Sequence, residues 1–91
     1  AMKNYGAEVI VVDGTYRDAE LLAQKTALKN RCLFISPYND EKIIRGQGTI
    51  ALEVFDQLQN IYQIENLAGS VWYIPVSGGG LLAGIASAVR M

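Results

Sequence analysis

The chain alternates short apolar runs, typical of β-strands, with longer segments whose apolar residues recur every three or four positions. The first run, residues 7–12, is rich in β-branched residues and ends at a turn-forming Asp-Gly pair. In the segment that follows, Thr15 and Asp18 have the spacing of a capping box. The pattern therefore predicts a strand and then a helix that ends near Lys29.

The same order recurs further along the chain. A second apolar run covers residues 32–36 and ends at a proline. Asp40 is suited to cap a single helical turn that Gly46 stops. The longest helix is then expected over residues 49–62, where an apolar stripe has helical spacing. The glycines before this helix predict either a hinge or cleft-lining turn, or a helix cap whose glycines allow tight packing.

A third apolar run, residues 71–76, is apolar on both faces, as a strand covered by helices on both sides would be. A small, apolar helix is expected after it, over residues 81–90. Three βα units in this order predict an α/β fold with a parallel sheet and right-handed crossovers. Three strands make a thin sheet, so we expect a piece of a larger α/β protein, or a unit that pairs with a partner to cover its apolar faces.

The loop between the last strand and the last helix carries the most chemical information. It reads Ser77, Gly78, Gly79, Gly80 and Leu81. Glycines let a ligand approach the main chain, and a helix N-terminus offers free N–H groups and partial positive charge to an anion. The loop therefore indicates a phosphate or other anion site, or glycines that only let helix and strand pack closely. It also fits the dinucleotide pattern G-x-G-x-x-A, without the acidic residue expected further along.

Composition narrows the possible chemistry. The chain has no histidine, which excludes Ser-His-Asp and Cys-His nucleophile systems and zinc sites built on histidine. A formal net charge of −1 gives no basic field for nucleic acid. A single cysteine, Cys32, permits no internal disulfide, and it is expected as a small core residue. Since no signal peptide or membrane helix is evident, we expect a cytoplasmic protein that binds neither nucleic acid nor membrane.

Four collinear stretches resemble the fold type II pyridoxal-phosphate enzymes, most closely the threonine and serine dehydratases and the serine racemases. Residues 74–86 resemble the phosphate loop of that family, and residues 6–10 its G-A-x-V strand start. Residues 34–40 resemble its F-I-x-P-[FY]-[ND]-D segment, and residues 44–53 its I-x-G-Q-G-T-I-A-x-E helix entry. Together these stretches extend over almost the whole chain.

The resemblance implies a central fragment of a two-domain enzyme. Residues 1–37 would be the end of the small domain, and residues 38–91 a large-domain segment with the phosphate-binding glycine loop. The resemblance gives residues 77–81 the role of binding the phosphate group of pyridoxal phosphate through main-chain N–H groups. The parent enzyme would be a lyase of amino-acid metabolism that eliminates water from a small hydroxy amino acid, serine or threonine, to give a 2-oxo acid and ammonia.

The Schiff-base lysine motif of the family is absent. No catalytic and no metal-binding residue is therefore assigned, and the chain alone is expected not to catalyse the reaction. The four lysines are expected on the surface; they are Lys3, Lys25, Lys29 and Lys42. Two alternatives stay open: a stand-alone oligomeric module for anion binding or protein interaction, and a dinucleotide-binding half-domain. If the chain is an enzyme fragment or a stand-alone module, we expect it to form a homo-oligomer or to pair with a complementing chain.

The aromatic residues are interpreted as packing residues. Trp72 and Tyr73 are expected in the core and on a face of the sheet, because they fall in the third strand. Tyr16 and Tyr38 lie beside turns and are expected at the edge of the core, with an interface role as the alternative.

Overall fold

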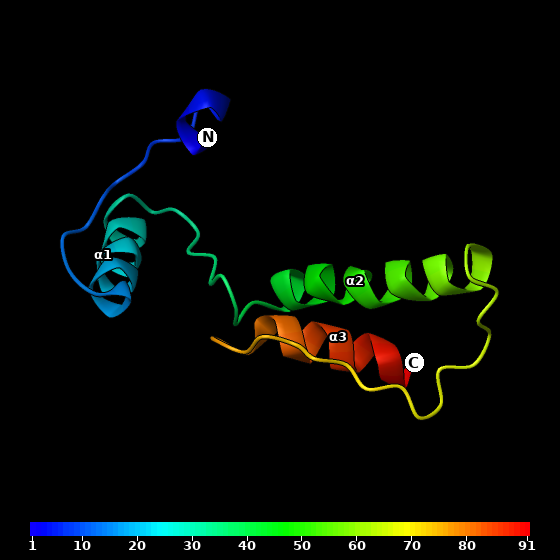
Figure 1. Ribbon diagram of the computed structural model, residues 1–91. Coiled ribbons are helices and arrows are strands. Elements are labelled where there is room, and N and C mark those ends of the chain that lie inside the picture. Colours follow the sequence, from blue (N-terminus) through cyan, green and yellow to red (C-terminus); the bar gives the residue numbers. More distant parts are fainter. The chain divides into compact units, whose positions relative to one another are not determined.

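The computed structural model describes residues 1–91 as helices joined by extended segments and turns (Figure 1). A short 3-10 helix, η1 (Met2–Tyr5), precedes three α-helices: α1 (Tyr16–Lys29), α2 (Glu41–Asn60) and α3 (Gly80–Arg90). The chain divides into two compact units, Ala1–Phe34 and Ile35–Met91, each of which is described by itself. The assignment of residues 1–37 and 38–91 to a small and a large domain stays a prediction.

The predicted α/β fold with a parallel sheet is wrong, because the structure contains helices and no β-strand. All three segments expected to be strands, residues 7–12, 32–36 and 71–76, have no regular secondary structure. A strand needs ladder hydrogen bonds to a neighbouring strand, and no hydrogen bond joins one of these segments to another. Apolar alternation predicts which segments favour an extended conformation, and it does not supply the partner that turns such a segment into a sheet.

In the first unit, helix α1 begins with the predicted capping box. The Thr15 hydroxyl accepts a hydrogen bond from the Asp18 amide at 3.3 Å, and the Asp18 carboxylate accepts from the Thr15 amide at 2.8 Å. The bonds from the Thr15 amide and hydroxyl lower the pKa of Asp18 below its ordinary value of 3.8. This cap is therefore fully present above the ordinary pKa and is lost as the pH falls through the lowered one.

In the second unit, helix α2 runs without interruption through Gly46 and Gly48. The predicted stop at Gly46 is therefore wrong. Asp40 does cap the helix, as predicted: its carboxylate accepts from the amides of Lys42 at 2.8 Å and Ile43 at 3.3 Å. The helix continues because it gains tertiary packing at Gly48, which outweighs the helix-breaking tendency of glycine, about 1 kcal/mol per residue.

Helices α2 and α3 pack closely at a pair of buried glycines, Gly48 and Gly84. A Cβ built at Gly84 would lie 2.7 Å from the amide nitrogen of Gly48 and would overlap the carbonyl oxygen of Ile44. A Cβ at Gly48 would lie 2.9 Å from the carbonyl oxygen of Gly84. The two helix backbones therefore touch, so Gly48 is used for tight packing as predicted, but these glycines lie inside α2 and not at its cap, which is Asp40.

The buried side chains of the second unit gather along the same contact. Among the hydrophobic residues, only Ala51 and Ile85 are buried, at 0% and 5% exposure. The start of α3 lies beside Tyr38, just before α2, and Gly84 lies beside Ile44 and Gly48. The two helices are therefore parallel, and residues 61–79 return from the end of α2 to the level of its beginning (Figure 1).

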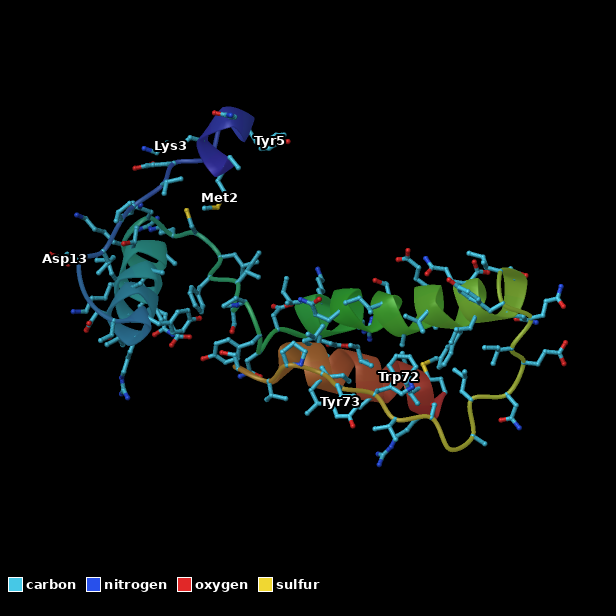
Figure 2. All side chains as sticks on the ribbon, in the orientation of Figure 1. Met2, Lys3, Tyr5, Asp13, Trp72 and Tyr73 are labelled. Carbon is cyan, nitrogen blue, oxygen red and sulfur yellow. The ribbon has the colours of Figure 1, made fainter.

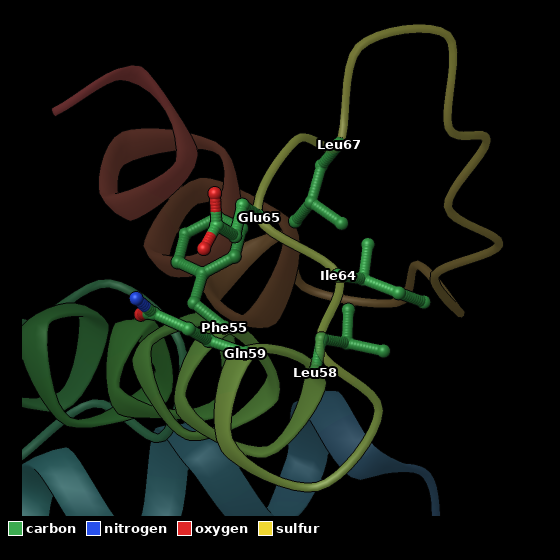
Figure 3. A pocket seen from close by; sticks show the side chains of 6 residues that line it. All are labelled: Phe55, Leu58, Gln59, Ile64, Glu65 and Leu67. Carbon is green, nitrogen blue, oxygen red and sulfur yellow. The ribbon is translucent and has the colours of Figure 1, made fainter.

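The returning segment is held to α2 by an aromatic contact. The rings of Phe55 and Trp72 meet edge to face, with centroids 5.8 Å apart and planes at 66°. Trp72 is half-buried, but Tyr73 is 94% exposed, so its expected packing on a sheet face is wrong (Figure 2). A pocket of about 250 Å³ opens where the segment leaves α2 (Figure 3). It is lined by Phe55, Leu58, Gln59, Ile64, Glu65 and Leu67.

Large apolar side chains are exposed in both units. Val11 and Leu33 in the first unit are 85% and 84% exposed, and Val71 in the second is 74% exposed. Cys32, expected in the core, is also exposed, because the sheet that would have buried it does not form. None of the helices combines the length and the apolar character that crossing a bilayer requires.

Candidate functional site

The predicted site residues lie together at the start of α3. Ser77, Gly78 and Gly79 form a bend, and Gly80 and Leu81 are the first two residues of the helix. Ser77 and Gly78 are exposed, whereas Gly80 is buried. Ser77 does not have a positive φ, so a serine is compatible with the loop conformation and adds a hydroxyl to the donors there.

Helix α3 differs from the other two α-helices in how it begins. Thr15 caps α1 and Asp40 caps α2 through side-chain oxygens, but the N-cap of α3 is Gly79, which has no side chain to accept a hydrogen bond. The first N–H groups of a helix have no partner within the helix. The amides at the start of α3 are therefore donors for water or for an anion, and the helix dipole favours the anion.

The three glycines of the loop differ in their surroundings. Gly79 has φ +93°, a left-handed conformation that favours glycine, and a Cβ there would meet no atom within 4 Å. A Cβ at Gly78 would overlap the side chain of Tyr38, and one at Gly80 would lie 2.7 Å from the Tyr38 carbonyl oxygen. Space for a ligand is thus left beside Gly79, while Tyr38 occupies the Cβ side of the other two.

Tyr38 is the residue of this site that sequence reasoning missed. Its half-buried position agrees with the expected place at a core edge. Its contact with the glycine loop joins residues about 40 positions apart, which no local pattern indicates. The only signal was its place in the segment over residues 34–40 that resembles a family motif.

Two other kinds of chemical group are relevant to catalysis, the lysines and the metal-binding side chains. The lysines lie on the surface, as predicted; Lys3, Lys25, Lys29 and Lys42 are all exposed. The structure brings together no group of three His, Cys, Asp or Glu side chains that could hold a metal ion.

Comparison with protein families shows which family the chain belongs to. The family model described as "Pyridoxal-phosphate dependent enzyme" matches residues 1–91, the whole chain. The chain belongs to the pyridoxal-phosphate-dependent enzyme family. The resemblance drawn from the four sequence motifs is therefore confirmed at the level of the family.

Curated relatives agree with the family match. The chain is 37% identical over 90 residues to proteins named "L-threonine dehydratase catabolic TdcB" from Staphylococcus aureus strains USA300, NCTC 8325 / PS 47 and COL. In each case the similarity covers 99% of this chain and 24% of the relative. The chain thus spans about a quarter of the length of these relatives. No solved structure matches it significantly.

The residues of the loop fit the phosphate group of the family's cofactor. A phosphate ester is an anion with several acceptor oxygens, and it needs hydrogen-bond donors. The start of α3 supplies main-chain N–H groups without a side-chain cap, the Ser77 side chain is exposed, and the space beside Gly79 is open. No basic side chain is required for such a site.

Proposed function

We propose that residues 77–81 bind the phosphate group of pyridoxal phosphate in an enzyme of the threonine dehydratase type. The uncapped N-terminus of α3 behind Gly79 is the observation that carries this proposal. The family match supports it, because the chain belongs to enzymes that depend on this cofactor. The amides of Gly80 and Leu81 would donate to phosphate oxygens, and the Ser77 hydroxyl would add a donor at the exposed side.

The proposed contacts set the expected strength of binding. A hydrogen bond to a charged group contributes about 1.5–3 kcal/mol. Association and ordering of a glycine-rich loop oppose this gain. Two or three such bonds give about 3–9 kcal/mol before these costs, so we expect weak binding, with a dissociation constant of about 1 mM for the phosphate group.

The test uses the ¹⁵N-labelled chain and pyridoxine 5′-phosphate, which lacks the aldehyde and so forms no Schiff base with surface lysines. We expect the amide resonances of Gly80, Leu81 and Leu82 to shift with a dissociation constant of about 1 mM. Inorganic phosphate should shift the same amides, because the phosphate group alone makes the proposed contacts. Amide chemical shifts in a titration give the measurement.

Pyridoxine without phosphate is the matched control and should leave these amides unchanged. Equal shifts with pyridoxine, or no shifts with either phosphate compound, would contradict the proposal. A nicotinamide dinucleotide is included because the loop also fits a dinucleotide pattern. If it bound these amides far more tightly than inorganic phosphate, the dinucleotide hypothesis would be preferred.

The reaction of the whole enzyme is a further part of the proposal. The curated relatives are named L-threonine dehydratases. We therefore propose that this chain serves an enzyme that eliminates water from a small hydroxy amino acid, threonine or serine. Pyridoxal phosphate, when bound, supplies the electron sink for such chemistry. The part assigned to residues 77–81 is to hold and orient the cofactor by its phosphate group.

We also propose that the chain associates, with a second copy of itself or with a complementing chain. Large apolar side chains such as Val11, Leu33 and Tyr73 are more than four-fifths exposed. Exposed apolar surface of this kind favours association. Sedimentation velocity over a range of concentrations should show dimers or larger species. A compact monomer at the highest concentration would contradict self-association, and the remaining candidate would be the complementing chain.

A further inference from the structure

The contact between Tyr38 and the glycine loop connects the start of α2 with the start of α3. A Cβ at Gly78 would overlap the Cγ of Tyr38 and would lie 2.6 Å from its Cβ. A Cβ at Gly80 would lie 2.7 Å from the carbonyl oxygen of Tyr38 and 2.9 Å from its Cα. The ring of Tyr38 therefore packs against Gly78, and its main chain packs against Gly80.

Hydrogen bonds hold the main chain at Tyr38 and in the residues that follow it. The Ser36 hydroxyl accepts from the amide of Tyr38 at 3.5 Å and from that of Asn39 at 3.0 Å. Asp40 then caps α2 through the amides of Lys42 and Ile43. A Ser-Pro turn and a helix cap thus fix the short segment from which Tyr38 reaches the loop.

A loop with three consecutive glycines has many conformations available, and binding an anion requires one of them. Tyr38 restricts the loop on the Cβ side of Gly78 and Gly80 and leaves the side of Gly79 open. We propose that Tyr38 is a positioning residue that holds the phosphate-binding loop in its binding conformation, so that the ring packing on Gly78 raises the affinity for a phosphate ester. This inference rests on the proposed function of residues 77–81.

The experiment compares Tyr38→Ala and Tyr38→Phe in the titration with pyridoxine 5′-phosphate. Loss of the ring should raise the dissociation constant about fivefold, because the loop must then be ordered at the moment of binding. Tyr38→Phe keeps the ring and should stay within about twofold of the original chain. Tyr73→Ala is the matched control, since Tyr73 is 94% exposed, and it should leave affinity unchanged.

Amide shifts report only on folded molecules, so a loss of stability alone does not change the measured constant. If Tyr38→Ala does not fold, Tyr38→Leu tests the role of the ring, because it keeps the Cβ and Cγ but not the ring. Tyr38→Leu should weaken binding more than Tyr38→Phe does. Unchanged affinity in a folded ring-deleted variant overturns the positioning role. Equal weakening by Tyr38→Phe also overturns it, because the hydroxyl would then act instead of the ring.

The two proposals fail in different ways. If the original chain binds neither pyridoxine 5′-phosphate nor inorganic phosphate, the proposed function is wrong and the positioning role falls with it. If the original chain binds both and the ring-deleted variants bind equally well, only the positioning role is wrong.

Discussion

Replacing Gly84 with alanine is expected to lower the free energy of unfolding of the second unit by about 1 kcal/mol. The new Cβ would overlap the carbonyl oxygen of Ile44 and would lie 2.7 Å from the amide nitrogen of Gly48. Both atoms belong to the main chain of α2, so no side-chain rotation relieves the clash. Overpacking of this kind costs about 1–3 kcal/mol, and the better helix propensity of alanine returns about 1 kcal/mol at most.

Gly46 provides the matched control in the same pair of helices. It lies inside α2, and a Cβ there would meet no atom within 4 Å. Gly46→Ala should therefore raise the free energy of unfolding by about 0.4–1 kcal/mol. Urea unfolding followed by far-ultraviolet circular dichroism measures both variants. If Gly84→Ala were as stable as Gly46→Ala, the close approach of α2 and α3 at this point would be wrong.

Local signals in the sequence were sufficient for the helices with clear starts. The Thr15 and Asp18 capping box and the end near Lys29 were predicted for α1 and are present in the structure. The helix predicted over residues 81–90 is α3, which begins one residue earlier, at Gly80. These features depend on hydrogen bonds and side-chain spacing within a few residues, which is why a sequence pattern detects them.

The errors concern features that depend on residues far apart in the chain. The local pattern predicts a helix stop at Gly46, but α2 continues because Gly48 packs against Gly84. The third apolar run, residues 71–76, has the pattern of a strand covered by helices on both sides, but its neighbour in the structure is helix α2, which Trp72 contacts through Phe55. The local alternation of apolar residues indicates neither the contact between α2 and α3 nor whether a strand has a partner.

The candidate site shows the same division. The loop over residues 77–81 was found from its glycines and from the helix start that follows, both of which are local. Tyr38 was missed as part of the site, because its contacts with Gly78 and Gly80 appear only when the two helix starts are brought together. A sequence pattern thus identified the candidate binding segment but not the residue that packs against it.

Replacing Gly80 with alanine is expected to have the largest effect on phosphate binding. The added Cβ would lie 2.7 Å from the carbonyl oxygen of Tyr38 and 2.9 Å from its Cα, so the loop must move away from Tyr38. The amides of Gly80 and Leu81 would move with it. A displacement of this kind costs about 1–3 kcal/mol, which corresponds to about a 5- to 150-fold loss of affinity for pyridoxine 5′-phosphate.

The neighbouring variant Gly78→Ala tests the reason for this loss. Its Cβ would meet the side chain of Tyr38, whereas that of Gly80→Ala meets the main chain. Adding Tyr38→Ala should therefore restore part of the affinity and stability that Gly78→Ala loses, and none of what Gly80→Ala loses. Double-mutant cycles measure this difference in coupling. Titrations and thermal unfolding of the single and double variants give both quantities. If Tyr38→Ala rescued both glycine variants equally, the main-chain contact at Gly80 would not be what closes that side of the loop.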